Sequence, residues 1–179
     1  MAELVKLHDL TFEPFISATS IEKRIAEIGK EISTKFIDKK PLFIAILNGA
    51  FVFAADLVRA CNIQSEIVFI KLTSYNGLES SGTVKTMIGL DMDIENRHIV
   101  IVEDIVDSGR TMHHFINDLN EKNPASISLA TLLIKPGALQ FPIKPEYIGF
   151  EIPTKFVIGY GLDYDGLGRN YPDIYHLKE

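Results

Sequence analysis

An α/β fold around a mainly parallel sheet is predicted by two features of this chain of 179 residues. Short β-branched apolar runs alternate with segments of helical periodicity. Polar residues follow several of these runs, and ligands of parallel sheets bind beyond such strand ends. The net charge of -6 and the apolar fraction of 46% are ordinary for a globular protein of this length. We therefore expect one α/β domain over residues 1–179.

The first predicted element is a helix over residues 19–35. Thr19-Ser20-Ile21-Glu22 fits a capping box at its start, and four isoleucines at helical spacing form one apolar stripe. The stripe consists of Ile21, Ile25, Ile28 and Ile32. A buried strand over 42–47, a helix over 51–61 that is apolar on most sides, and a strand over 65–72 are expected next.

The polar segment 73–84 has no apolar periodicity, and segments of this kind often form mobile lids. A strand pair is predicted over 84–90 and 98–102. The next helix has an apolar face, and the last core strands are expected over 126–135 and 156–161. That helix face consists of Met112, Phe115, Ile116 and Leu119. The residues expected at strand ends facing one crevice are Asn48, Asp104, Lys135 and Asp163.

The most informative segment covers residues 100–111 and has the sequence VIVEDIVDSGRT. Its strand ends in two carboxylates, Glu103 and Asp104, which accept hydrogen bonds from hydroxyl groups and coordinate hard cations. The turn 107–111 then opens a helix, where free N–H groups and the helix dipole favour a phosphate. The pattern predicts a ligand with hydroxyl groups and a phosphate. An ordinary acidic turn after a buried strand is the alternative.

This segment resembles the 5-phosphoribosyl diphosphate (PRPP) signature of the type I phosphoribosyltransferases. Three further segments within residues 42–169 resemble the branch of that family that acts on 6-oxopurines. The resemblance implies the type I phosphoribosyltransferase fold, with a core over about 18–161 and a small hood from the N- and C-terminal segments. It also implies a flexible catalytic loop over about 73–84, in which Ser74 and Tyr75 match the family's dipeptide.

The function implied by this resemblance is transfer of the 5-phosphoribosyl group from PRPP to hypoxanthine, and to guanine, in purine salvage. The products would be IMP or GMP and pyrophosphate. Glu103 and Asp104 would hold the ribose hydroxyls, and Asp107 would act as general base or proton relay. The residues that would bind the 5′-phosphate are Asp107, Ser108, Gly109, Arg110 and Thr111.

The same resemblance assigns the pyrophosphate to the turn at Asn48 and Gly49 and to Arg169, whose planar cation suits bidentate contact with phosphate. Many relatives have Lys-Gly-Gly where this chain has Asn48-Gly49-Ala50. The departure leaves open whether the turn contributes charge, and whether the 47–48 peptide bond is cis as in relatives. A plain strand-to-helix turn is compatible with the residues alone.

The same resemblance implies that Lys135 donates to the exocyclic oxygen of the purine. Because an ammonium group only donates, it would favour a 6-oxo over a 6-amino base. The resemblance adds Phe156 as a stacking ring. The remaining purine residues would be Val157, Leu162 and Asp163, and a Mg²⁺ ion would be held by Asp163, Glu103 and Asp104. Without the resemblance, Lys135 would be a solvated lysine and Phe156 a core aromatic residue.

Other classes of function and partner are disfavoured. The acidic net charge and the lack of a basic arm argue against a nucleic-acid partner, and so against a PRPP-binding transcription regulator. A P-loop hydrolase is excluded because the G-x-x-x-x-G-K-[ST] motif does not occur. Cys61 is the only cysteine, and neither a signal peptide nor a long apolar run is present, so we expect a cytoplasmic protein without a membrane partner. The resemblance implies a homodimer or homotetramer.

Overall fold

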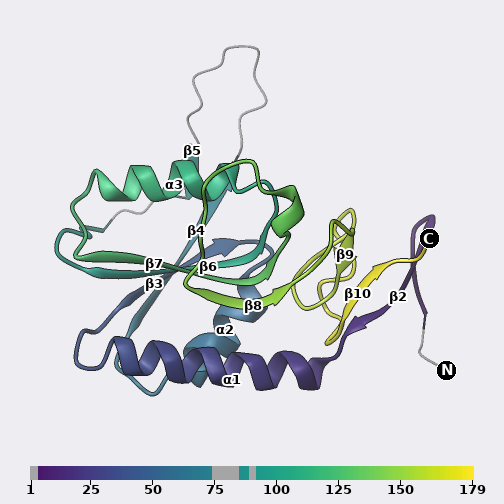
Figure 1. Ribbon diagram of the computed structural model, residues 1–179, viewed down its shortest axis with the longest axis horizontal. Coiled ribbons are helices and arrows are strands. Elements are labelled where there is room, and N and C mark those ends of the chain that lie inside the picture. The colour runs from purple at the N-terminus through teal and green to yellow at the C-terminus, as the bar shows by residue number, and fades with distance from the viewer. Residues whose placement is uncertain (1–3, 74–84, 89–91) are drawn as a thin grey trace, which may run out of the picture.

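Two β-sheets with three α-helices form the described part of the computed structural model, which comprises residues 4–73, 85–88 and 92–179 (Figure 1). The larger, central sheet has six strands in the order β5-β4-β3-β6-β7-β8. These strands are β3 (Leu42–Leu47), β4 (Glu66–Thr73), β5 (Lys85–Ile88), β6 (His98–Val106), β7 (Ser126–Ile134) and β8 (Tyr147–Glu151).

Five strands of the central sheet run parallel, and β5 pairs with β4 in the antiparallel direction. The central strands β3 and β6 are covered on both faces, and Phe43, Ile44, Val100 and Ile101 are fully buried. The predicted α/β fold with a mainly parallel sheet is confirmed. The predicted pairing of strands 84–90 and 98–102 is wrong. β5 pairs with β4, the strand before it in the chain, while β6 lies between β3 and β7.

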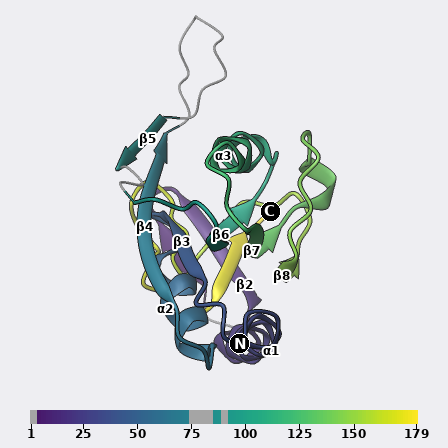
Figure 2. The ribbon, with the colours of Figure 1, turned by 90° about the vertical axis from the view of Figure 1, so that its left-hand side faces the viewer.

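The helices cover both faces of this sheet. Figure 2 shows α3 (Arg110–Asn120) on one face and α1 (Ala18–Lys35) and α2 (Phe51–Ala60) on the other. The isoleucine stripe of α1 is buried as predicted. The predicted capping box is wrong, because the Oγ atom of Ser17 accepts a hydrogen bond from the backbone N–H of Ser20 at 3.2 Å and caps the helix.

The helix α2 is less covered than its apolar composition predicts. It buries Phe53, Ala54 and Leu57, but Phe51 is 42% exposed. The physical reason is that α2 packs against the sheet and against α1, which cover only part of its circumference. The expectation of burial on most sides is therefore wrong for the first turn.

The smaller sheet, which we call the hood, has four antiparallel strands in the order β1-β2-β10-β9. These strands are β1 (Val5–Leu7), β2 (Leu10–Ile16), β9 (Val157–Ile158) and β10 (Ile174–Leu177). The predicted core strand over 156–161 is wrong, since β9 is only two residues long and belongs to the hood. Positive φ angles at Gly159, Tyr160 and Gly161 turn the chain away and end the strand.

The described residues contain no helix that is long and apolar enough to cross a membrane. The predicted catalytic loop, with Ser74 and Tyr75, lies outside the described residues except for Thr73 at the end of β4.

Candidate active site

The carboxyl ends of β3, β6 and β7 lie side by side at one edge of the central sheet. β3 is followed by Asn48 through a cis peptide bond, β6 by Asp107 and β7 by Lys135. Adjacent parallel strands bring the residues at their carboxyl ends to a common edge. Asp163 reaches the site differently from the prediction, because it belongs to the loop between the hood strands β9 and β10.

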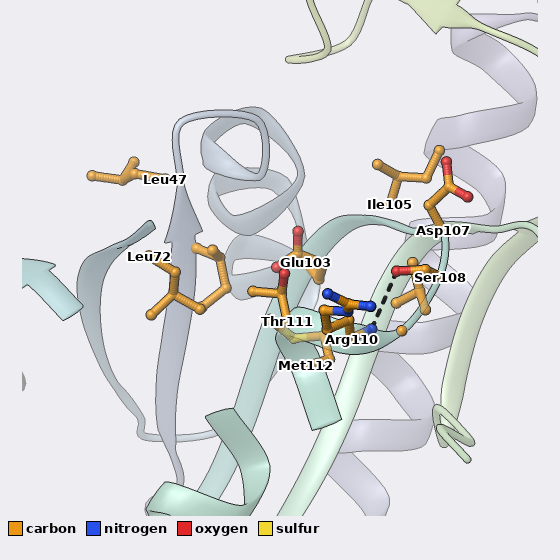
Figure 3. Close-up of a pocket in the computed structure, with 12 residues that line it drawn as sticks. Leu47, Leu72, Glu103, Ile105, Asp107, Ser108, Arg110, Thr111 and Met112 are labelled. Carbon is orange, nitrogen blue, oxygen red and sulfur yellow. Dashed lines mark hydrogen bonds between the residues drawn. The ribbon is translucent and has the colours of Figure 1, made fainter. Parts of the chain in front are cut away.

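A pocket of about 260 Å³ opens between the end of β6 and the start of α3 (Figure 3). Its polar wall is formed by Glu103 and by the turn 107–111, which are residues that the sequence assigned to the sugar and the phosphate. Its apolar wall consists of Ile46, Leu47, Leu72, Ile105, Val106 and Met112. Asp104 does not line this pocket.

The phosphate-binding prediction is supported by the local geometry of the α3 start. Gly109 takes a left-handed conformation with φ of 77°, and α3 has no side-chain cap. The backbone N–H of Arg110 donates to the Ser108 Oγ atom at 3.3 Å, while the Arg110 guanidinium lies 5.5 Å from the centroid of the Phe141 ring. Backbone N–H groups and the helix dipole therefore add to the positive charge of Arg110 at this turn.

Glu103 and Asp104 form a coupled acid pair. Burial raises the pKa of Glu103 well above its usual range, and the charge of Asp104 and a hydrogen bond between the two carboxyl groups add to this. Burial also raises the pKa of Asp104, whereas Glu103, the Ile105 N–H at 2.8 Å and Arg169 favour its charged form. The Oε2 atom of Glu103 is buried without a hydrogen-bond partner among the described residues. A hydroxyl donor or a cation would satisfy it.

A second cluster surrounds Asp104 on the other side of β6. A Cβ atom on Gly49 would lie 1.5 Å from Asp104 Oδ2, and one on Gly161 would lie 2.2 Å from the Gly49 carbonyl oxygen. Arg169 donates through Nη1 to the Gly161 carbonyl at 2.6 Å and pairs through Nη2 with Asp163 Oδ1 at 2.6 Å. The residues predicted for pyrophosphate are thus brought together with Asp104 and Asp163, whereas Glu103, the third predicted metal ligand, lines the pocket at the start of α3.

Lys135 and Asp107 form an ion pair that the sequence did not reveal. The distance from Lys135 Nζ to Asp107 Oδ2 is 2.7 Å. Lys135 is only 8% exposed, whereas the Asp107 side chain is 54% exposed. The pair forms because Ile134 and Val106 are register partners in β7 and β6, so the following residues are neighbours. The residue predicted to select the 6-oxo group thus contacts the residue predicted to handle the proton.

The hood supplies the aromatic and apolar residues predicted for the purine. Phe156 is 43% exposed, and its ring contacts Tyr164 edge-to-face with a centroid distance of 5.7 Å. Val157 and Leu162 are buried. One face of the Phe156 ring system is therefore backed by the hood while much of the ring stays available for stacking.

No three His, Cys, Asp or Glu side chains in the described ranges are grouped so that they could hold a metal ion by themselves. Asp163 forms an ion pair with Arg169 and accepts a hydrogen bond from the Gly166 N–H at 2.8 Å. It is therefore not grouped with the Glu103–Asp104 pair. Mg²⁺ keeps several waters and often binds one or two carboxylates together with substrate phosphates. The acid pair fits that mode, in which the substrate completes the coordination.

Two contacts near the site were missed by the sequence analysis. Tyr160 donates a hydrogen bond to Asp56 Oδ2 at 2.5 Å, and Tyr164 donates to Asp9 Oδ1 at 2.9 Å. Both join residues far apart in the chain, so no local pattern could predict the partners. The flanking glycines of Gly159-Tyr160-Gly161 were the only available signal of unusual backbone there.

Comparisons with known proteins agree with this site. Residues 17–165 match the model of the phosphoribosyl transferase domain family. The chain is 41% identical over 172 residues to hypoxanthine-guanine phosphoribosyltransferase of Bacillus subtilis, covering 96% of this chain and 95% of that protein. It is 42% identical over 167 residues to hypoxanthine phosphoribosyltransferase of Buchnera aphidicola, covering 92% and 94%. The crystal structure of a hypoxanthine phosphoribosyltransferase from Staphylococcus aureus superposes with a TM-score of 0.88 at 34% identity, covering 93% and 91%.

The fold, the helix-start pocket and the acid pair at the end of β6 define a type I phosphoribosyltransferase. Similarity at this level extends over nearly the whole chain. The chain belongs to the hypoxanthine(-guanine) phosphoribosyltransferase family, the pentosyltransferases of purine salvage.

Proposed function

We propose that this chain transfers the 5-phosphoribosyl group of PRPP to hypoxanthine and guanine and releases pyrophosphate. The observation that carries the proposal is the Lys135–Asp107 ion pair at 2.7 Å, directly beside the pocket at the start of α3. In the reaction the bond from C1 of the ribose to pyrophosphate breaks, and a bond from C1 to a ring nitrogen of the purine forms. The purine loses one proton.

The pocket at the start of α3 receives the 5′-phosphate. The turn 107–111 lines it, and its backbone N–H groups and the hydroxyls of Ser108 and Thr111 would donate to the phosphate. Glu103 and Asp104 accept the ribose hydroxyls, and Glu103 Oε2 gains the partner it lacks. The sugar is thus fixed at two points. Its hydroxyl groups bind near the carboxyl end of β6, and its 5′-phosphate binds at the start of α3.

The pyrophosphate is held by Asn48, Gly49 and Arg169. The negative charge on this leaving group grows as its bond to C1 lengthens, and the fixed guanidinium and backbone donors stabilise that charge. A Mg²⁺ ion held by Glu103 and Asp104 together with the substrate would neutralise part of the same charge. Asp163 also keeps Arg169 oriented through their ion pair.

The purine stacks on Phe156 and packs on Leu162. It forms hydrogen bonds with the backbone of Val157 and with Asp163. Lys135 donates to its 6-oxo oxygen, and Asp107 accepts the proton from its imidazole nitrogen. The ion pair orients Asp107 for that transfer. An adenine 6-amino group would meet a second donor in Lys135, so adenine is rejected.

We further propose that the chain works as a homodimer or homotetramer in the cytoplasm. Phe51 and Phe69 are each 42% exposed, and apolar rings of this size support a contact with another copy. The thiol of Cys61, the one cysteine, is compatible with a reducing compartment.

The test is an assay of pyrophosphate release with PRPP and Mg²⁺, offering hypoxanthine, guanine, xanthine and adenine in parallel. We expect turnover with the 6-oxopurines and none with adenine. Asp107→Asn should lower kcat by roughly 10²–10⁴-fold, as expected for a general base. Lys135→Ala should lower the ratio of kcat/KM for a 6-oxopurine to kcat/KM for adenine. PRPP binding without turnover on any base would refute the proposal and favour a PRPP-binding regulator.

A further inference from the structure

A turn of unusual backbone lies between the hood and the pyrophosphate cluster. Gly159, Tyr160 and Gly161 have φ angles of 94°, 48° and 99°. A left-handed conformation is uncommon for a bulky aromatic residue, and it persists only where surrounding contacts impose it. Strained residues of this kind concentrate at functional sites, so the contacts that hold Tyr160 indicate what the turn is for.

Tyr160 is held at both ends. Its backbone N–H donates to the Tyr171 carbonyl at 2.8 Å, and its hydroxyl donates to Asp56 Oδ2 at 2.5 Å. The ring is buried, and burial together with the Asp56 carboxylate raises the pKa of Tyr160, so the hydroxyl stays protonated and acts as the donor. The other oxygen of Asp56, Oδ1, lies 3.5 Å from Nη1 of the exposed Arg59.

The two residues belong to the two segments that form the pyrophosphate cluster. Asp56 lies on α2, which begins directly after the Asn48-Gly49-Ala50 turn. Tyr160 directly precedes Gly161, whose Cα faces the Gly49 carbonyl and whose own carbonyl accepts the hydrogen bond from Arg169. The hydrogen bond thus connects the element carrying the Gly49 turn with the loop carrying Arg169.

We propose that Tyr160 and Asp56 are a positioning pair for pyrophosphate: their hydrogen bond holds Gly161 against Gly49 and so sets the distance between the Gly49 turn and Arg169. This inference rests on the proposed function of that cluster. The purine side is anchored separately, because β9 is paired with β10 and Leu162 is packed in the core. Loss of the hydrogen bond therefore weakens PRPP and pyrophosphate binding and spares the purine.

The experiment compares Tyr160→Phe, Asp56→Ala, Asp56→Asn and the double variant Tyr160→Phe/Asp56→Ala with the unmodified protein. Steady-state kinetics with Mg²⁺ give KM for PRPP and for hypoxanthine, and calorimetric titration gives Kd for pyrophosphate. Tyr160→Phe and Asp56→Ala should each raise KM for PRPP and Kd for pyrophosphate roughly two- to thirtyfold, the range for mutations that couple to a site indirectly. KM for hypoxanthine should not change.

Two features of the result separate positioning from a general loss of stability. Asp56→Asn keeps an acceptor oxygen for the Tyr160 hydroxyl and should restore most of the affinity for pyrophosphate. The double variant should be no worse than either single variant, because both remove the same bond. Tyr147→Phe is the matched control, since it removes a buried tyrosine hydroxyl that has no hydrogen-bond partner among the described residues and should leave all three constants unchanged.

The inference is overturned if both KM values rise together, if only kcat falls, or if Asp56→Asn behaves like Asp56→Ala. It is also overturned if the single effects add in the double variant. Failure of the proposed function has a different signature: the unmodified protein would release no pyrophosphate with any base. The pyrophosphate titration would still support or refute the positioning pair in that case.

Discussion

At the scale of single residues, the site depends on close approach of backbone to side chain. Gly49 leaves its Asp104 neighbour room that no other residue would leave, and Gly161 does the same for the Gly49 carbonyl. These contacts stack three layers, from the acid pair through the Gly49 turn to the Arg169 loop. A change of one atom in the middle layer must displace one of the other two.

Gly49→Ala tests this packing. Because its Cβ would lie 1.5 Å from Asp104 Oδ2, the turn or the acid pair must move, and we expect kcat/KM for PRPP to fall about 10²-fold, as misplacement by about 1 Å can do. The matched control is Gly137→Ala, whose Cβ would meet nothing closer than Thr154 Oγ1 at 3.8 Å. Equal kinetics of the two variants would contradict the proposed role of the turn.

The Lys135–Asp107 ion pair leads to a second prediction at this scale. Removing it should affect catalysis much more than stability. Asp107 is more than half exposed, so removing its partner does not leave a buried unpaired charge. We expect Lys135→Met, which keeps the apolar stem, to change the free energy of unfolding by less than about 1 kcal/mol. Turnover of hypoxanthine should nevertheless drop by at least tenfold, or about 1.4 kcal/mol in the barrier. Urea unfolding and kinetics on the same preparation provide both numbers, and a large loss of stability would show that the pair is structural.

At the scale of elements, the start of α1 allows a comparison of the observed cap, Ser17, with the predicted cap, Thr19. Ser17 Oγ accepts from Ser20 N, and the Ala18 N–H donates to Asp173 Oδ1 at 2.6 Å, which ties the helix start to the hood. Ser17→Ala should lower the free energy of unfolding by roughly 0.5–2 kcal/mol. Thr19→Ala should be neutral or slightly stabilising, because Thr19 is exposed inside the first turn. Urea denaturation of both variants checks this, and a larger effect at Thr19 would restore the capping box.

Elements with a strong period were predictable from the sequence. The stripe of α1, the apolar run of β3 and the order strand, turn, helix over residues 100–111 occur as their patterns predicted. The predicted strand end at residue 102 is wrong, because β6 continues through Glu103 and Asp104 to Val106. The hood strands were not located, because β1 and β9 are too short to show a period. The Gly159-Tyr160-Gly161 segment continues an apolar run, and only its positive φ angles reveal that the strand has ended.

The sequence predicted which residues belong to the candidate site, but it did not predict the contacts between them. The residues could be named because each lies in a local motif. The Lys135–Asp107 and Arg169–Asp163 pairs depend on other information. The first requires knowing that β6 and β7 are neighbours in the sheet, and the second requires the path of the glycine-rich loop after β9. Neither follows from periodicity or composition.

At the scale of the whole molecule, the site lies where the hood meets the carboxyl edge of the central sheet. Contacts at Tyr160, Gly161 and Ala18 join the segment between β9 and β10 to α2, to the Gly49 turn and to the start of α1. The residues proposed to bind the phosphate and the sugar lie at the central sheet, as does Lys135, while the other residues proposed to bind the purine lie in or next to the hood. The protein thus maintains a buried acid pair at the junction, and burial of these carboxyl groups lowers the free energy of unfolding of the whole domain.

This loss of stability is measurable as a dependence of the free energy of unfolding on pH. The pKa of Glu103 is raised above the ordinary carboxyl value of 4.5, so the folded state binds more protons than the unfolded state above that value. The stabilising contribution is fully present below pH 4.5 and is lost as the pH rises through the raised pKa. We expect Glu103→Gln to abolish this loss and to increase the free energy of unfolding of the ligand-free protein at neutral pH by roughly 0.5–2 kcal/mol. Urea unfolding across the pH range measures it, with Glu22→Gln on the exposed face of α1 as control.

The same variant should lose what the acid pair is there to do. Glu103→Gln keeps the shape of the side chain but removes a negative charge beside Asp104, so the thermal shift caused by PRPP with Mg²⁺ should shrink while the ligand-free protein melts at a higher temperature. Opposite changes in these two readouts would establish that the buried carboxylate is kept for binding at the expense of stability. Destabilisation of the ligand-free protein at neutral pH would instead mean that Glu103 supports the fold, and that the strain at this junction lies elsewhere.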